Sequence, residues 1–303
     1  MKVVIPQLAI QVLHDIAQCL ESVKGAIDIE PIFWDVSKKP IIDMFDEVSP
    51  EVIMLHESQL DNAFAIVAQE FDFKYVLVGE KLPSEIRKPP SAVITSAPFL
   101  QNFPQSYRDL DSVFSDPIPS HVMEAKHLAR LAQIHGGSYN SHMKSEVLVD
   151  TSGVEIDSHI FDILSFLTSN YKTKIIGSNV VKLHHYLGVV NIFERADFIK
   201  STQIMIDLNG SAAWDASYLK VPSIAIDNRE APHILQFNSI STLKGNIDSI
   251  LNKKLVRDKY IDLCYNEVAK GNTYHHFTAK LFKNINEPDI ADCLTTYVGE
   301  LLQ

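Results

Sequence analysis

The chain has 303 residues, of which 46% are hydrophobic and 21% charged, and its formal net charge is −11. The length predicts two domains of about 150 residues each, and the composition is typical of a globular protein. The acidic balance, without a block of Lys or Arg, argues against a nucleic-acid-binding protein, and no apolar run approaches the ~20 residues that span a bilayer.

Two further features narrow the class of protein. The N-terminal residues contain no long apolar stretch followed by a small-residue cleavage site, so we expect no signal peptide and a cytoplasmic location. The three cysteines, Cys19, Cys264 and Cys293, lie far apart and form no CxxC pair. We therefore expect buried thiols rather than disulfides or a zinc site.

The first hundred residues alternate between short apolar runs and helical patterns. The expected strands are Lys2–Pro6, Ile27–Trp34, Glu51–Leu55, Tyr75–Val78 and Ala92–Thr95. The expected helices are Leu8–Val23, Ile41–Glu47 and Asp61–Phe71. Strands that are apolar almost throughout need cover on both faces, so this alternation predicts a doubly wound parallel sheet.

The regular pattern ends after Ala97. Four prolines interrupt the chain between Ala97 and Pro119, and helical spacing resumes at Val122–Ile134. The pair Gly136-Gly137 ends that helix, because glycine readily adopts the backbone conformations that terminate helices. We therefore place the domain boundary at residue 140, with a first domain of residues 1–140.

Residues 141–303 repeat the alternation and predict a second Rossmann-like domain. The expected strands are Glu146–Val149, Lys174–Gly177, Leu187–Val190, Gln203–Leu208 and Ser223–Ile226. The expected helices are Ile156–Thr168, Ile192–Lys200 and Ser211–Leu219, followed by three helical stretches after Ser241, the last of them Asp289–Leu302.

The most informative segment is Ile204–Asn228, which reads as strand, tight turn, helix, tight turn and strand. Asn209 and Gly210 tolerate positive φ, and Ser211 is a residue typical of helix N-caps. The N-terminus of a helix at the carboxyl edge of a parallel sheet binds anions, above all phosphates. One helical turn further on, Asp215 is placed to accept a hydrogen bond from a ribose hydroxyl. The alternative interpretation is a well-capped turn with no ligand.

The sequence after this turn bears a family likeness. Lys220-Val221-Pro222 followed by an apolar strand resembles the C-terminal domain of glycosyltransferases of the GT-B fold, nearest to the heptosyltransferase and spore-coat types. In the former, an Asp-Ser-Gly-Pro turn stands where this chain has Asp207–Gly210. Asp46–Leu55 and Gly271–Phe282 also resemble segments of these enzymes.

The resemblance implies two Rossmann-like domains that face each other across a cleft, with the last helix packed back on the first domain. It also implies that the turn Asn209–Ser211 holds the diphosphate of a nucleotide-sugar, which is a co-substrate, so no separate cofactor is expected. The chain departs from the pattern in lacking a G-x-G-x-x-G motif and in offering Asp215 where many relatives have Glu. Its cation for the diphosphate is undetermined between Lys182, Lys200 and Arg195.

Glycosyl transfer needs a stabilised leaving diphosphate and, in inverting enzymes, a base. On the donor side we expect Gly177, Ser178 and Asn179, which follow a strand, with Lys182 adding positive charge. The same residues also fit an ordinary strand exit with a solvated lysine.

The base should follow a strand of the first domain. His56 and Glu57 directly follow Glu51–Leu55, and a histidine has the right ordinary pKa. Glu80 is the next candidate, and Asp111 and Asp116 come after it. His56 also fits a local cap of the next helix.

No spacing of His, Cys, Asp or Glu fits a metal site, so we expect a metal-independent enzyme. We predict a glycosyltransferase that moves a sugar from a nucleotide-sugar donor to a glycan, a small molecule or a modified DNA base. Two alternatives stay open: a sugar-nucleotide epimerase of the same fold, and a non-catalytic two-lobed ligand-binding protein.

Overall fold

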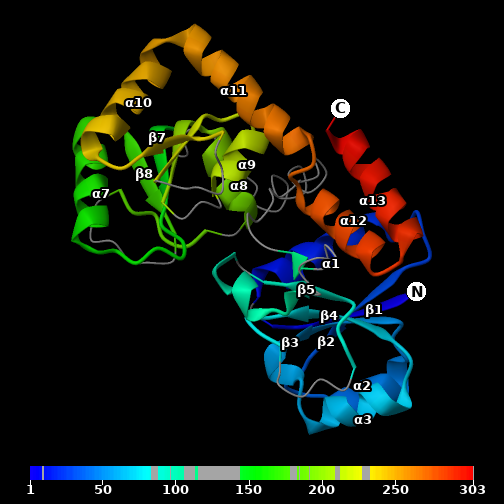
Figure 1. Cartoon of the computed structure of the whole chain (residues 1–303). Helices are drawn as coiled ribbons and strands as arrows, with labels where there is room; N and C mark the ends of the chain where they lie inside the picture. Colours follow the sequence, from blue (N-terminus) through cyan, green and yellow to red (C-terminus); the bar gives the residue numbers. More distant parts are fainter. Residues whose placement is uncertain are drawn as a thin grey trace, which may run out of the picture. The chain divides into compact units, whose positions relative to one another are not determined.

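The computed structural model forms two compact units (Figure 1). It describes residues 1–8, 10–82, 88–95, 97–105, 113–114, 144–177, 183, 185–190, 192–208, 212–226 and 233–302. The first unit comprises Met1–Ile118 together with Tyr274–Gln303, and the second comprises Pro119–Thr273. The boundary expected at residue 140 and the helix expected at 122–134 lie outside the described residues.

The first unit is built on a six-stranded parallel sheet of order β2-β1-β3-β4-β5-β6. Its strands are β1 (Lys2–Pro6), β2 (Glu30–Trp34), β3 (Val52–His56), β4 (Lys74–Val78), β5 (Ala92–Ile94) and β6 (Val113–Phe114). Its first helices are α1 (Gln11–Val23), α2 (Ile41–Val48) and α3 (Asn62–Glu70), with 3-10 turns η1 (Glu57–Gln59) and η2 (Ala97–Asn102).

Alternate side chains of these strands enter separate cores on the two faces of the sheet. In β1, Val3 and Ile5 pack on the face covered by α1, whereas Val4 packs on the face covered by α2 and α3. A strand buried on both faces needs apolar residues at every position, which is why its sequence lacks polar alternation. The doubly wound sheet predicted for this unit is confirmed.

The last two helices complete the first unit. They are α12 (Tyr274–Asn284) and α13 (Pro288–Leu301). Leu281, Phe282 and Leu294 share a buried core with Ile16 and Leu20 of α1. The end of the chain therefore covers apolar surface that its beginning presents.

The second unit has a five-stranded parallel sheet of order β11-β10-β9-β7-β8. Its strands are β7 (Ser145–Asp150), β8 (Thr173–Ile176), β9 (Thr202–Asp207), β10 (Ser223–Ile226) and β11 (Leu235–Phe237). Its helices are α7 (Ser158–Asn170), α8 (Ile192–Lys200), α9 (Ala212–Tyr218), α10 (Ile240–Asn252) and α11 (Lys254–Ala269).

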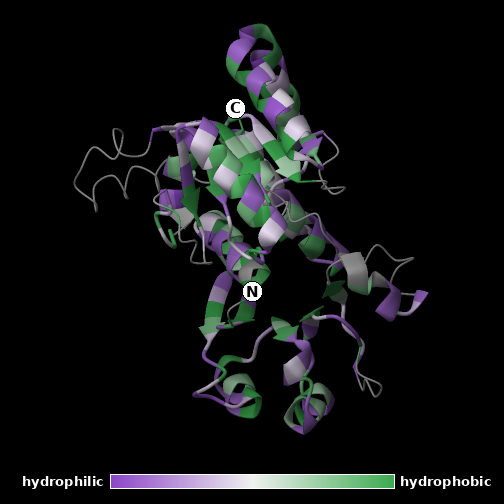
Figure 2. Cartoon of the chain, turned by 90° about the vertical axis from the view of Figure 1, so that its left-hand side faces the viewer, coloured by the Kyte–Doolittle hydropathy of each residue, from purple (hydrophilic) through white to green (hydrophobic). Residues whose placement is uncertain are grey.

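The second sheet is also covered on both faces. In β7, Val147 and Val149 pack in the core formed with α7 and α10, whereas Leu148 packs in the core formed with α8 and α9. The helices of the chain carry both hydrophilic and hydrophobic residues (Figure 2). When the strands of each unit are counted from its own start, the first five have the same spatial order in both, 2-1-3-4-5.

Three details differ from the sequence-based expectation. Four helices, α10 to α13, close the described chain where three helical stretches were expected. Leu187–Val190 is not a strand, although a β-bridge pairs Tyr186 with Ile175 and the backbone N–H of Leu187 donates to the carbonyl of Ile175 at 2.9 Å. The short strand β11 was not predicted, because Leu235–Phe237 offers only three residues of pattern.

Candidate functional site

The order of the second sheet marks where a ligand would bind. In open α/β sheets, ligands bind beyond the carboxyl ends of the strands, where the strand order reverses. In the second unit that point lies between β7 and β9. These strands end in Asp150 and Asp207, which are register partners and are 2% and 0% exposed.

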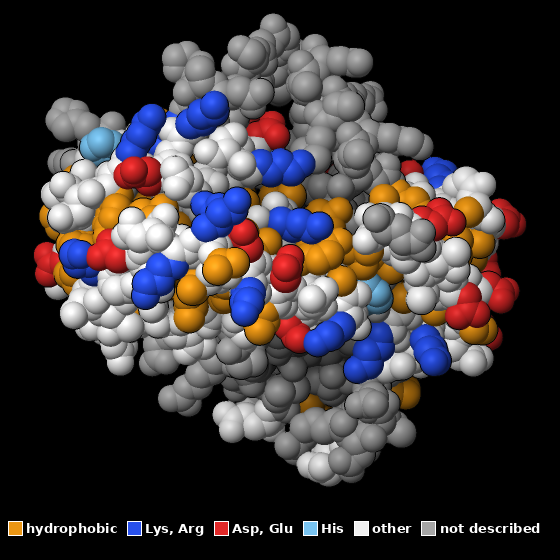
Figure 3. Space-filling view, turned by 90° about the horizontal axis from the view of Figure 1, so that it is seen from above, with side chains coloured by type: hydrophobic (Ala, Val, Ile, Leu, Met, Phe, Trp, Pro, Cys, Tyr) orange, Lys and Arg blue, Asp and Glu red, His pale blue; other side chains and the backbone are white. Residues whose placement is uncertain are grey.

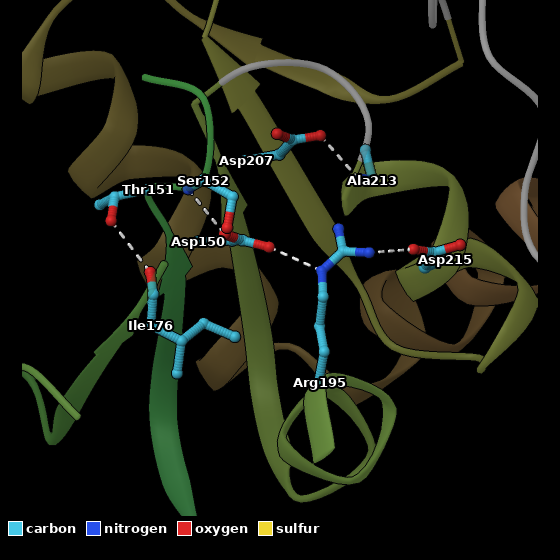
Figure 4. A network of polar contacts seen from close by, with 8 residues as sticks. All are labelled: Asp150, Thr151, Ser152, Ile176, Arg195, Asp207, Ala213 and Asp215. Atoms are coloured by element: carbon cyan, nitrogen blue, oxygen red, sulfur yellow. Dashed lines mark hydrogen bonds and ion pairs between the residues drawn. The ribbon is translucent and has the colours of Figure 1, made fainter. Parts of the chain in front are cut away.

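One arginine connects the acidic groups around this point (Figure 4). Arg195, from α8, donates through Nε to Oδ2 of Asp150 at 2.6 Å and through Nη1 to Oδ2 of Asp215 at 2.5 Å. Asp215 comes from the first turn of α9, so a single guanidinium ties α8 to the end of β7 and to α9. The side chains of Arg195, Asp150 and Asp215 are 17%, 3% and 13% exposed.

Burial alone would lower the pKa of Arg195, but the carboxylates of Asp215, Asp150 and Asp207 raise it above its ordinary value. The guanidinium is therefore permanently charged. Three carboxylates surround one cation, and the cluster carries more negative than positive charge. Carboxylates in such a cluster can accept hydrogen bonds from the hydroxyl groups of a sugar.

Asp207 also caps α9. Its Oδ2 accepts a hydrogen bond from the backbone N–H of Ala213 at 2.6 Å, so one of the N–H groups at this helix start already faces a carboxylate. The predicted phosphate-binding residues Asn209, Gly210 and Ser211 lie outside the described residues. Asp215, which we expected at a ribose, is held by Arg195.

Gly177 brings the end of β8 against the end of β7. Its φ is +137°, and a Cβ at this position would lie 2.4 Å from Oγ1 of Thr151. Thr151 in turn donates to the carbonyl of Ile176 through its N–H at 2.8 Å and its hydroxyl at 3.0 Å. Gly177 thus has a structural reason to be glycine. Its predicted companions Ser178, Asn179 and Lys182 lie outside the described residues.

In the first unit, His56 ends β3, Glu57 follows it and Glu80 lies in the loop after β4; β3 also lies at the reversal of strand order. Oε2 of Glu57 accepts from the backbone N–H groups of Glu80 at 2.8 Å and Lys81 at 3.2 Å. The carboxylate of Glu57 is thus fixed to the loop after β4, and the structure brings Glu57 and Glu80 together.

His56 caps the short turn η1. Its Nδ1 lies 3.3 Å from the backbone N of Ser58 and 2.8 Å from Oγ of Ser58, while its own N–H donates to Oε1 of Gln59 at 2.8 Å. The local cap weighed for His56 is therefore present. Asp111 and Asp116 lie outside the described residues.

Sequence reasoning missed Asp150 and Asp207 as members of the site. Both stand at the carboxyl end of a buried strand, and this position was the available signal. Arg195 was considered only as a cation for a diphosphate, not as the partner of two carboxylates.

The thiols and metals give no further site in the described part of the chain. Burial raises the pKa of Cys19 to about 12 and that of Cys264 to about 11, which keeps both as thiols. Among the described residues, no group of three His, Cys, Asp or Glu side chains could hold a metal ion. None of the helices in the described ranges is long and apolar enough to cross a membrane.

No protein-family model and no curated protein sequence matches this chain. Solved structures do. A glycosyltransferase from Rickettsia africae aligns with a TM-score of 0.59 at 12% identity, over 95% of this chain and 97% of its own. The UDP-GlcNAc 2-epimerase from Neisseria meningitidis, bound to UDP-GlcNAc, aligns with a TM-score of 0.57 at 10% identity, over 98% of this chain and 99% of its own.

Sucrose-phosphate synthase from Thermosynechococcus elongatus aligns with a TM-score of 0.59 at 8% identity, over 93% of this chain and 98% of its own. At such identities the similarity establishes the fold. The chain has the GT-B fold, which glycosyltransferases and UDP-GlcNAc 2-epimerases share.

Proposed function

We propose that this chain is a sugar-nucleotide enzyme, and in particular a metal-independent glycosyltransferase. The observation that carries the proposal is the cluster of Asp150, Arg195, Asp207 and Asp215 at the reversal of strand order of the second sheet. A nucleotide-sugar has many hydroxyl groups and one diphosphate. The cluster offers carboxylate acceptors for the hydroxyl groups. The guanidinium of Arg195 is already paired with Asp150 and Asp215, so the diphosphate is proposed to lie at Lys182 and the turn Asn209–Ser211.

The donor side is proposed to include Gly177, Ser178, Asn179, Lys182 and the turn Asn209–Ser211, with Asp215 facing the ribose. We propose His56 as the base in preference to Glu57, because two backbone N–H groups already occupy one oxygen of the Glu57 carboxylate. The backbone N–H of Ser58 donates to Nδ1 of His56, so a neutral ring in this cap carries its proton on Nε2, and His56 must leave the cap or exchange its tautomer before Nε2 can accept a proton. Glu80 is the second choice.

The second candidate function is epimerisation of a sugar nucleotide. It is favoured by the alignment with the Neisseria epimerase, which spans nearly the whole of both chains. The acceptor separates the two reactions, since a transferase releases nucleotide only when an acceptor is present, whereas an epimerase changes the sugar nucleotide by itself.

Thermal-shift measurements with UDP, GDP, ADP, CMP and their sugars test the property that both candidate functions require, which is the binding of a sugar nucleotide. We expect at least one nucleoside diphosphate to raise the melting temperature, and Gly210→Val to remove that shift. Gly25→Val is the matched control, because a Cβ at Gly25 meets nothing within 4 Å. If no nucleotide raises the melting temperature, the proposal is wrong.

Product analysis of the stabilising sugar nucleotide then distinguishes the reactions. Free nucleotide that appears only with an acceptor indicates transfer, and a changed sugar nucleotide without acceptor indicates epimerisation. Binding without either product would support the two-lobed binding protein instead.

A further inference from the structure

Helix α11 has apolar side chains on two opposite faces. On one face Cys264 and Val268 are buried in a core with Trp214 of α9. On the other, Leu255 is 78% and Leu263 50% exposed, and Val256 beside them is 44% exposed. A helix that is apolar on more than its core-facing stripe has a second apolar environment to meet.

The exposed apolar residues lie along one line of the helix. Leu255, Lys259 and Leu263 are spaced by four residues and therefore lie on one face. The helix itself is firmly placed, because the hydroxyl of Tyr260 donates to the carbonyl of Ser223 at 2.6 Å and accepts from the N–H of Leu235 at 2.8 Å. The exposed line is thus a fixed surface of the second unit.

Lysine side chains that form no ion pair with a described residue flank the exposed apolar residues of α11. Lys253, Lys254 and Lys259 are exposed and form no ion pair with any described residue, and the first turn of α11 contains no acidic side chain. Nearby Lys244 and Lys270, in contrast, pair with Asp248 and Glu267.

The view onto the side of α10 and α11 shows Lys and Arg side chains spread among hydrophobic ones (Figure 3). Arg257 pairs with Asp258 at 3.5 Å, and Asp262 is the exposed acid on the same helix. The surface is therefore locally positive in a chain whose net charge is −11.

We propose that this surface, formed by Lys253, Lys254, Leu255, Val256, Lys259 and Leu263, binds an anionic phospholipid membrane. The leucines and the valine would enter the boundary between headgroups and acyl chains, and the lysines would remain at the anionic headgroups. The proposal does not depend on the reaction that the chain catalyses.

The arrangement fits a membrane better than two other anionic partners. A nucleic-acid backbone would pair with the lysines but would leave Leu255 and Leu263 without an apolar contact. A second copy of the chain would have to bury Lys259 in the middle of an apolar line, which is costly without a carboxylate partner. At a membrane, the long lysine side chain reaches the headgroups from within the same line.

The test is co-sedimentation of the full chain with vesicles of phosphatidylcholine containing phosphatidylglycerol, compared with vesicles of phosphatidylcholine alone. We expect binding only to the anionic vesicles, and we expect it to weaken as salt is raised. The triple variant Lys253→Gln/Lys254→Gln/Lys259→Gln should weaken binding roughly 100-fold, since each basic residue contributes about fivefold near such a surface.

Two further variants make the test specific. The control Lys24→Gln/Lys38→Gln/Lys39→Gln changes the net charge equally but removes ion-paired lysines of the first unit, so it should bind like the unchanged chain. Leu255→Ser/Val256→Ser should also reduce binding at unchanged charge, whereas Val189→Ser, at a residue 73% exposed elsewhere, should not.

Three results would overturn the proposal. They are failure to bind anionic vesicles, equal loss in the two lysine variants, and unchanged binding of Leu255→Ser/Val256→Ser. Self-association that disappears with Leu255→Ser/Val256→Ser, measured by sedimentation velocity without vesicles, would assign the surface to a second copy instead.

Discussion

Arg195 shows how strongly a single side chain can be bound to its surroundings. Its guanidinium serves two carboxylates, Asp150 and Asp215, that lie 45 and 20 residues away in the sequence. All three side chains are largely removed from solvent, so each charge depends on the others. An intact buried ion-pair cluster of this kind is weak evidence for stability, but removal of one member leaves the buried charges of the others without a partner.

The first prediction follows from this dependence. Arg195→Ala should lower the free energy of unfolding by about 3–5 kcal/mol, because it leaves two buried carboxylates without their cation. Urea denaturation measures the change. Lys38→Ala, at an exposed pair with Asp35, is the control and should leave the midpoint unchanged. Equal midpoints for Arg195→Ala and the parent chain would contradict the interpretation.

His233 gives a pH-dependent prediction. Burial lowers the pKa of His233 in the folded chain, and the ring packs against Trp214 with centroids 4.8 Å apart. Below about pH 6.5 the unfolded state therefore binds more protons at this residue than the folded state, so stability falls as the pH falls.

We expect His233→Phe to weaken that dependence, measured as the free energy of unfolding between pH 5 and pH 8. Burial also lowers the pKa of His276, which acts in the same direction. The difference between variant and parent therefore isolates His233. An identical slope in both chains would exclude a contribution from His233.

At the residue scale, the sequence allowed only part of the site to be predicted. Asp215 was identified because it follows a recognisable turn at helical spacing. Its pairing with Arg195 was not predictable, because it depends on how α8 and α9 pack on the same sheet. Asp150 follows an expected strand, which was a signal in the sequence, but only the strand order, with β7 beside β9, places it at the point of reversal.

At the scale of elements, the exit of β8 illustrates a constraint set by a neighbouring strand. Gly177 has a positive φ, and the loop after β7 occupies the space that a side chain would need. Gly188 also has a positive φ, of +97°, but a Cβ there would meet nothing within 4 Å. A comparison of substitutions at these two glycines therefore separates the cost of a positive φ from the cost of a steric clash.

We predict that Gly177→Ala destabilises the chain by clearly more than Gly188→Ala. Adoption of this backbone conformation by alanine costs of order 1–3 kcal/mol at either position, and at Gly177 the contact with Thr151 adds to it. Chemical denaturation of the two variants measures the difference. If both lose the same stability, the approach of Thr151 is not a constraint.

Most elements could be predicted because strands buried on both faces have an unmistakable composition. Runs such as Val52–Leu55 lack polar residues, and helices between them have the spacing of one apolar stripe. β11 could not be predicted, because its three residues pair with β10 only after the sheet has formed. The strand expected at Leu187–Val190 was wrong for the converse reason. Leu187 and Val189 are apolar, as the residues of a buried strand would be, but they are exposed.

At the scale of the whole molecule, the two tryptophans offer one reporter for each unit. Trp34 is buried in the first unit and Trp214 in the second, at 5% and 4% exposure. The variants Trp214→Phe and Trp34→Phe therefore make the fluorescence of the remaining tryptophan a measure of one unit alone.

Leu294→Ala, made in these backgrounds, tests whether α13 stabilises the first unit. Removal of this fully buried side chain should destabilise that unit by about 2–5 kcal/mol. The unfolding midpoint reported by Trp34 should fall, and the midpoint reported by Trp214 should not. A shift of equal size in both signals would show that the units do not unfold separately.

The composition of the first unit also has a consequence for synthesis on the ribosome. Its sheet emerges first, but the helices α12 and α13 that cover α1 begin about 250 residues after α1 ends. At about 5–20 residues per second, the apolar surface of α1 waits roughly 13 to 50 seconds for its cover. During that interval the second unit, whose elements are contiguous in the chain, can complete its fold. We therefore expect the nascent first unit to expose apolar surface for longer than the second unit.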